Sequence, residues 1–92
     1  MIVALGQIVV SRAGRDAGRK FVVIKVLDND FVEISDGDLH RIEKPKKKRM
    51  KHLNIADQKS EDLEKKLKNG SKITNAEIRK ALAALDIQQN VE

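Results

Sequence analysis

The sequence predicts a mainly β fold, a small antiparallel barrel followed by a C-terminal helical hairpin. Before residue 55, short apolar runs recur at intervals of about ten residues, with polar turns between them. After Asn54 the apolar residues take helical spacing, and capping residues come before them. The chain has 92 residues, so we expect a barrel at 1–55 and a hairpin at 56–92.

Four strands are expected in the first part. The run from Phe21 to Leu27 is apolar on both faces, which is typical of a strand that crosses a core and then bends over it. In the next strand, Val32 and Ile34 share one face. Aspartate-rich turns at 28–30 and 36–38 separate these strands. The four predicted strands are Ile8–Val10, Phe21–Leu27, Phe31–Ser35 and Leu39–Ile42.

Two short helices are expected after residue 56. Ser60 can cap the first, and Asn69-Gly70 can end it. Thr74 and Glu77 have the spacing of a capping box for the second helix. Its apolar stripe is Ile78, Ala81, Leu82 and Leu85. The hairpin either packs on the barrel as a brace or extends from it as a partner-binding appendage.

The positive charge of the chain is concentrated before residue 53. The net charge is +5, and residues 1–52 contain 12 Lys/Arg against 7 Asp/Glu. The remaining residues contain 7 of each. Such a local excess attracts polyanions, of which nucleic acid is the commonest, although a solvated surface that keeps the protein soluble would look similar.

The segment between the first two predicted strands is a basic loop. Glycines let a backbone approach a phosphate closely, and arginine forks pair with its oxygens. It is not a P-loop, because three residues separate Gly14 from Gly18 and no Ser or Thr follows Lys20. An ordinary hairpin connection remains an alternative. The candidate RNA-binding residues here are Arg12, Arg15, Gly18, Arg19 and Lys20.

A second basic element lies at residues 44–52. Pro45 ends the preceding strand, and repulsion among the like charges favours an extended, solvated arm that could follow RNA phosphates. A charged linker and a nuclear import signal are the alternatives. The candidate RNA-binding residues here, with one just before, are Arg41, Lys44, Lys46, Lys47, Lys48, Arg49, Lys51 and His52.

Aromatic residues are scarce, which limits how RNA could be bound. Phe21 is expected in the core, Phe31 after its turn could be partly exposed, and there is no Tyr or Trp. Proteins that read unpaired bases usually stack them on exposed aromatics. Recognition of the phosphate backbone of folded RNA therefore suits the sequence better.

Catalysis and metal binding have little support in the sequence. There is no Cys, and His40 and His52, the only histidines, lie twelve residues apart. We expect no enzyme activity, no cofactor and no metal. The apolar start at Met1–Leu5 is too short for a signal peptide, so we expect a soluble, cytoplasmic protein. We also expect the free protein to be a monomer.

The run from Gly6 to Val26 resembles the KOW motif of ribosomal proteins and transcription elongation factors. Gly18 matches its glycine, and Arg19 and Lys20 match the basic residues that follow. The segments at 36–37, 41–53 and 72–82 are similar to small bacterial KOW proteins related to the large-subunit ribosomal protein L-fourteen-e. The resemblance implies an SH3-like barrel and association with RNA or the ribosome.

The sequence therefore predicts an RNA-binding, ribosomal or ribosome-associated protein that grips the backbone of structured ribosomal RNA. The alternative is a protein-interaction module that docks a translation or transcription factor, with the charges serving only solubility.

Overall fold

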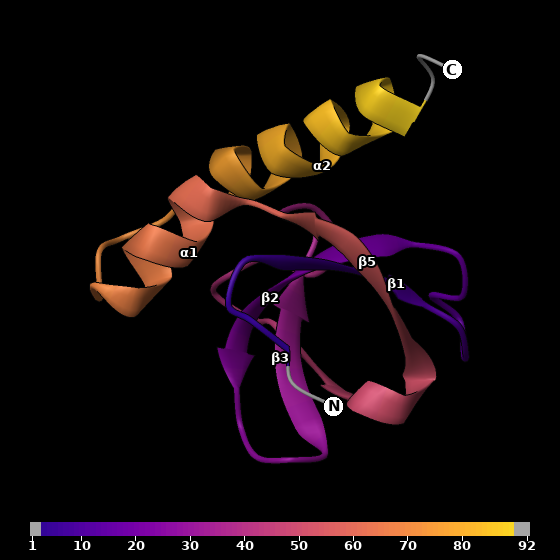
Figure 1. Cartoon of the computed structure of the whole chain (residues 1–92). Coiled ribbons are helices and arrows are strands. Elements are labelled where there is room, and N and C mark those ends of the chain that lie inside the picture. Colours follow the sequence, from indigo (N-terminus) through magenta and orange to yellow (C-terminus); the bar gives the residue numbers. More distant parts are fainter. Residues whose placement is uncertain (1–2, 90–92) are drawn as a thin grey trace.

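The computed structural model describes residues 3–89, with side chains described up to residue 84. Five strands form one antiparallel sheet in the order β4-β3-β2-β1-β5 (Figure 1). A short 3-10 turn, η1, links the two edge strands β4 and β5, and two helices follow. The predicted mainly β fold with C-terminal helices is confirmed. The elements are β1 (Gln7–Ser11), β2 (Lys20–Val26), β3 (Phe31–Ser35), β4 (Lys46–Arg49), η1 (Met50–His52), β5 (Leu53–Lys59), α1 (Glu61–Lys68) and α2 (Asn75–Gln89).

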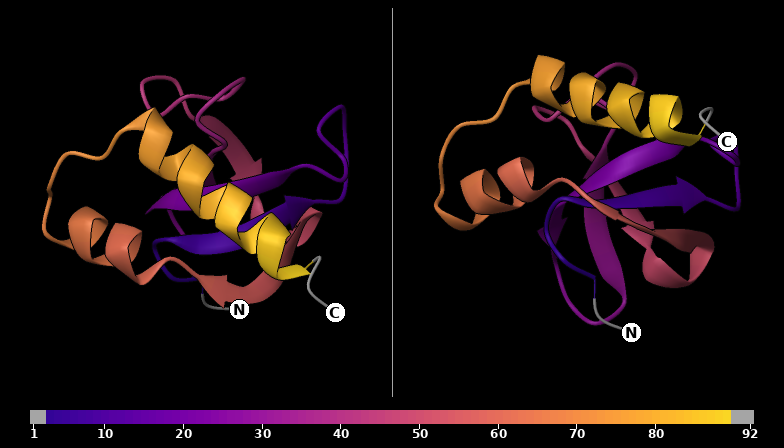
Figure 2. Two further views of the ribbon diagram at one scale, coloured as in Figure 1. Left: turned by 90° about the horizontal axis from the view of Figure 1, so that it is seen from above. Right: turned by 45° about the horizontal axis from the view of Figure 1, so that its top comes forward.

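The sheet buries apolar residues on both of its faces. On one face Phe21 and Val23 of β2 join an inner cluster, and on the other Val22 packs with the two helices. Seen from above, α2 lies across the strands (Figure 2). The helices thus brace the sheet, which explains why β2 is apolar on both faces. The inner cluster is Val3, Val9, Phe21, Val23, Val32, Ile34 and Leu53, and the helix-side cluster is Ile8, Val22, Leu63 and Ile78.

The predicted helix signals are confirmed. The Ser60 hydroxyl accepts a hydrogen bond from the Leu63 N–H at 3.3 Å, and Asn69 caps the other end of α1. Thr74 and Glu77 exchange two hydrogen bonds of 3.2 Å, which is the capping box. The side chain of Leu85, the last residue of the predicted stripe, lies outside the described side chains. No helix in the described part of the chain is both long and apolar enough to span a membrane.

The prediction of a strand at Leu39–Ile42 is wrong. The Asp36 carboxylate accepts backbone hydrogen bonds from Asp38 and His40, at 3.0 and 2.8 Å, and so turns this segment into a loop. The Ile42 side chain packs against the helix-side cluster. Its N–H donates to the Asn75 side-chain oxygen at 2.9 Å. Ile42, one of the apolar residues that suggested a strand, therefore packs beside the helices and fixes the start of α2.

The prediction of a solvated arm at 44–52 is also wrong, because this segment contains β4 and η1. Strand β4 pairs with β3, with Lys46 opposite Ile34 and Lys48 opposite Val32. These two lysines are half-buried, since their stems lie on the face of the sheet that carries the inner core. Backbone pairing and stem burial outweigh the repulsion among the lysines.

Strand β5 was not predicted from the sequence. It begins at the buried Leu53 and pairs with β1, and the register shifts between Gln7 and Val9. At this irregularity the Gln7 side-chain amide donates to the carbonyls of Ala56 and Gln58. The irregular pairing interrupts the apolar alternation by which a strand is usually identified.

Candidate nucleic-acid interface

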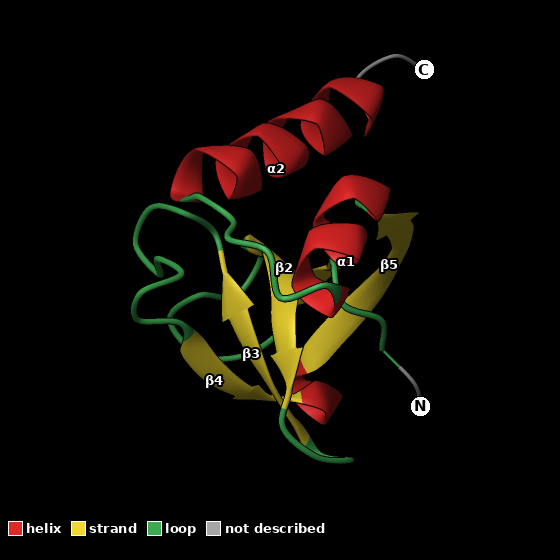
Figure 3. Cartoon of the chain, turned by 90° about the vertical axis from the view of Figure 1, so that its left-hand side faces the viewer, coloured by secondary structure: helices red, strands yellow, loops and turns green. Residues whose placement is uncertain are grey.

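The two predicted basic elements meet in space. The Lys48 ammonium group donates to the Ala13 carbonyl at 3.2 Å, and the Arg12 N–H donates to the His52 carbonyl at 2.9 Å. The β1–β2 loop is therefore fastened both to β4 and to the end of η1. Figure 3 shows β4 at an edge of the sheet, away from most of α2. We call the surface formed by the loop at 12–19, the segment at 41–45, β4 and η1 the basic junction.

Asp16 is the anchor of the basic junction. Its carboxylate, largely buried, accepts a hydrogen bond from Lys46 and lies 3.2 Å from Nε2 of His40. The hydrogen bond from Lys46 lowers the pKa of Asp16, against the opposing effect of burial, and His40 lowers it further. The His40 ring in turn lies 5.7 Å from that of Phe21 in the core. Lys46 thus positions the loop and is already paired with a carboxylate.

Arg19 is held in a similar way. Its guanidinium lies 3.0 Å from the carboxylate of Asp36, whose side chain is only 6 % exposed. Burial raises the pKa of Asp36, but hydrogen bonds from the His40 and Asp38 N–H groups and the charge of Arg19 outweigh burial, so the pKa is lowered. The pair ties the end of the β1–β2 loop to the β3–β4 loop. Arg19 and Lys46, both predicted to contact phosphate, therefore neutralise buried carboxylates.

The other two basic residues of β4 point to the opposite face. Lys47 and Arg49 are exposed, and they lie 4.7 and 4.9 Å from the centre of the Phe31 ring. Phe31 is half-buried, in agreement with the prediction, and Phe21 is fully buried. The ring holds both cations beside each other through cation–π attraction and leaves them on the surface.

Most of the other predicted residues of the junction face solvent. Lys20, the first residue of β2 and just outside the junction, is half-buried and interacts within the protein. Gly18 has a φ of +87°, and a Cβ built on it would meet no atom within 4 Å, so its backbone is open to a ligand. The predicted basic residues with exposed side chains are Arg12, Arg15, Arg41, Lys44, Lys47, Arg49, Lys51 and His52.

Arg79 of α2 is a basic residue near the site that the sequence analysis missed. It donates a hydrogen bond to the Gly37 carbonyl and lines a hollow of about 550 Å³ with Gly18, Arg19 and Lys20. The sequence held no signal for this contact, because Arg79 lies off the apolar stripe that contains Ile78 and only the packing of α2 brings it to Gly37. The helices therefore carry one cation toward the predicted loop.

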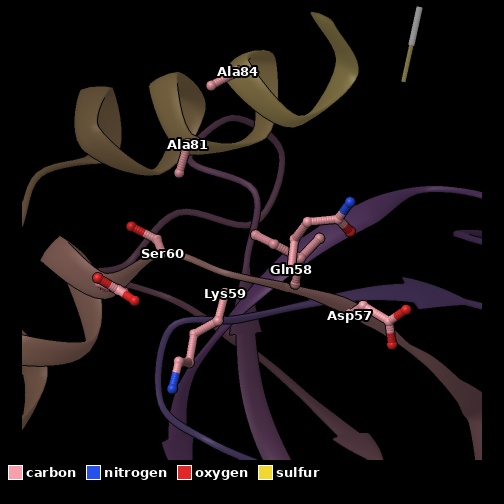
Figure 4. A pocket seen from close by; sticks show the side chains of 8 residues that line it. Asp57, Gln58, Lys59, Ser60, Ala81 and Ala84 are labelled. Atoms are coloured by element: carbon pink, nitrogen blue, oxygen red, sulfur yellow. The ribbon is translucent and has the colours of Figure 1, made fainter. Parts of the chain in front are cut away.

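A different hollow, of about 470 Å³, lies between β5 and α2. In Figure 4, Ala81 and Ala84 of α2 lie across from Asp57–Ser60. Ile8 contributes a further apolar side chain. Among the described residues that line this hollow, Lys59 is the one basic residue, and none is a predicted RNA-binding residue.

No protein-family model matches the chain. A stretch of 55 residues is 34% identical to the large ribosomal subunit protein eL14 of Desulfurococcus amylolyticus. The match covers 60% of this chain and 57% of that protein, so the chain aligns with little more than half of the relative. The predicted similarity to the L-fourteen-e proteins is thus supported. The relative is archaeal, and the predicted link to a bacterial group has no support.

Proposed function

We propose that this chain is a ribosomal or ribosome-associated protein that binds structured ribosomal RNA through the basic junction. The observation that carries the proposal is the fastening of the β1–β2 loop to β4 by Lys46 and Lys48. Two basic segments about 30 residues apart in the chain are thereby held next to each other. The partial similarity to a large-subunit ribosomal protein supports the same conclusion.

The residues of the junction have two roles in this proposal. The exposed cations bind phosphates and release the counterions condensed on RNA. Arg19 and Lys46 instead neutralise Asp36 and Asp16, and so hold the loop in the shape that presents those cations. Phosphate contacts fix position without reading sequence, so the junction recognises the shape of a folded RNA.

Salt dependence tests this mechanism directly. Binding of the full chain to purified large-subunit ribosomal RNA is measured between 50 and 200 mM salt. With six to ten phosphate contacts, the affinity falls by roughly 10³–10⁵ over this range. A binding curve that is nearly flat in salt would contradict the mechanism.

Crosslinking in cells tests the location. We expect ribosomal RNA to crosslink at residues 12–19 and 44–52 and ribosome association to persist at moderate salt. Crosslinks confined to the helices would place the RNA on another face and contradict the assignment of the junction.

The hollow in Figure 4 favours a second candidate, a protein-interaction module. Strand β5 is an edge strand, and exposed strand edges can accept an extended segment of a partner. Ile8, Ala81 and Ala84 would supply its apolar contacts. Recovery of a stable protein partner after nuclease treatment, with loss of ribosome association, would favour this candidate over RNA binding.

A further inference from the structure

A hollow of about 360 Å³ lies at the border of the basic junction, where the turn at 28–30 meets η1. The Met50 N–H donates to the Asp30 carbonyl at 2.7 Å, so the two sides of the hollow are fastened together. The volume falls at the low end of the range for small-molecule sites in proteins. Its lining residues are Asn29, Asp30, Arg49, Met50 and Lys51.

The lining of this hollow suits a flat, partly apolar group. Met50 is half-buried against the inner core, and it offers a flexible apolar surface to the hollow. Arg49 is held in place by the Phe31 ring. Arginine guanidinium planes are among the surfaces on which unpaired RNA bases stack. The hollow can thus hold a base without an exposed aromatic residue.

The carboxylate of Asp30 shows which kind of group the hollow can accept. Within the described part of the chain, no hydrogen bond or ion pair of this carboxylate is found, whereas the neighbouring Asp28 accepts from the Asp30 and Phe31 N–H groups. Asp28 therefore shapes the turn, whereas the carboxylate of Asp30 is exposed beside the hollow. A carboxylate repels phosphate but accepts hydrogen bonds from amino groups on base edges.

We propose that this hollow binds one unpaired RNA base that carries an exocyclic amino group, with Asp30 as the hydrogen-bond acceptor. The proposal rests on the proposed function, because Lys51 would hold a flanking phosphate while the Arg49 plane stacks on the base. Cytosine presents an amino donor where uracil presents a carbonyl oxygen, so the carboxylate favours cytosine over uracil. The chain would then read one base within a contact that otherwise follows the backbone.

Two single-stranded decamers, one of cytidine and one of uridine, test the proposal because they carry equal charge. We expect the full-length protein to bind the cytidine decamer about 3- to 10-fold more tightly, in line with the net contribution of one ordinary hydrogen bond at an exposed site. Asp30→Asn should bring this ratio to about one or reverse it, because an amide can also donate to uracil. Asp57→Asn removes the same charge from an exposed position of β5 and should leave the ratio unchanged.

Equal affinity for the two decamers, or an unchanged ratio in Asp30→Asn, would overturn the base site. A comparable loss of the ratio in Asp57→Asn would also overturn it, because the effect would then come from net charge. None of these results affects the proposed function, which fails separately if binding to ribosomal RNA does not depend on salt. The side chain of Asp30 is exposed, so folding of its variant can be checked by circular dichroism against the wild type.

Discussion

The ammonium group of Lys46 lies 2.5 Å from the carboxylate of Asp16, 30 residues earlier in the chain. This contact separates the basic residues of β4 into two groups. Lys46 and Lys48 point to the β1–β2 loop and hold it, whereas Lys47 and Arg49 face solvent over Phe31. Neighbours in one short lysine run therefore have different tasks, and substitution can separate them.

Lys46→Ala should reduce stability, and Lys47→Ala should reduce RNA affinity. The first leaves the largely buried Asp16 without its strongest partner, at a cost of about 1 kcal/mol. For a domain of this size, that lowers the melting temperature by roughly 4–8 °C. Thermal unfolding and RNA titration of both variants test whether Lys46 acts on stability and Lys47 on RNA affinity. Equal melting temperatures would show that the contact with Asp16 does not stabilise the fold.

The outer cations should set the salt dependence of RNA binding. In the triple variant Lys47→Ala, Arg49→Ala, Lys51→Ala, the slope of log affinity against log salt should shrink by about 0.7–0.9 for each phosphate that the protein no longer neutralises. The matched control replaces Lys65, Lys72 and Lys80, which are exposed in the C-terminal part. If both variants shift the slope alike, net charge and not the junction governs binding.

Gly37→Ala should destabilise the protein more than Gly70→Ala. Both glycines have a φ near +70°, so alanine is strained at both, by about 1–2 kcal/mol. At Gly37 a Cβ would also lie 2.5 Å from the Asn75 carbonyl oxygen, whereas at Gly70 nothing lies within 4 Å. The additional clash should cost a further ~1–3 kcal/mol and loosen α2. Urea unfolding of the two variants measures the difference between their free energies of unfolding. Equal destabilisation would show that α2 can move away from the added Cβ at no cost in stability.

Acid should weaken the fold through Asp16 and Asp36. Both have pKa values below the ordinary value, Asp16 mainly through Lys46 and Asp36 through hydrogen bonds and Arg19 that outweigh its burial. Because ionised carboxylates are favoured in the folded state, their stabilisation is present above pH ~4 and is lost as pH falls through the folded pKa values. The free energy of unfolding should therefore decline below pH ~4, and less steeply in Asp16→Asn. An equally steep decline in that variant would assign the acid sensitivity to other groups.

Elements that carry their own apolar pattern or caps could be predicted from the sequence. β2, β3 and both helices have such signals. In β3, Val32 and Ile34 are the buried apolar pair, and Ser60 caps α1. β4 has none, because its four residues are all basic and it is held by pairing with β3. The misplaced strand at Leu39–Ile42 has the opposite cause, since its apolar residues suggested pairing while Ile42 packs beside the helices.

The composition of the candidate site was predictable, but its geometry was not. Charge counting identifies Lys46 and Arg19 as candidate RNA-binding cations. Their pairing with Asp16 and Asp36 depends on segments that only the folded sheet brings together. Local patterns also gave no reason to distinguish Asp28, which shapes its turn, from the neighbouring Asp30.

The fastening of the β1–β2 loop to β4 has a consequence for protein synthesis. Chains emerge from the N-terminus, and the loop at 12–19 is made well before the strand that secures it. A nascent chain ending near residue 40 carries the arginines of the loop but not Lys46 or Lys48, and an isolated hairpin is marginally stable. Until translation has passed β4, the growing chain therefore lacks the two lysines that fasten the loop at 12–19 in place.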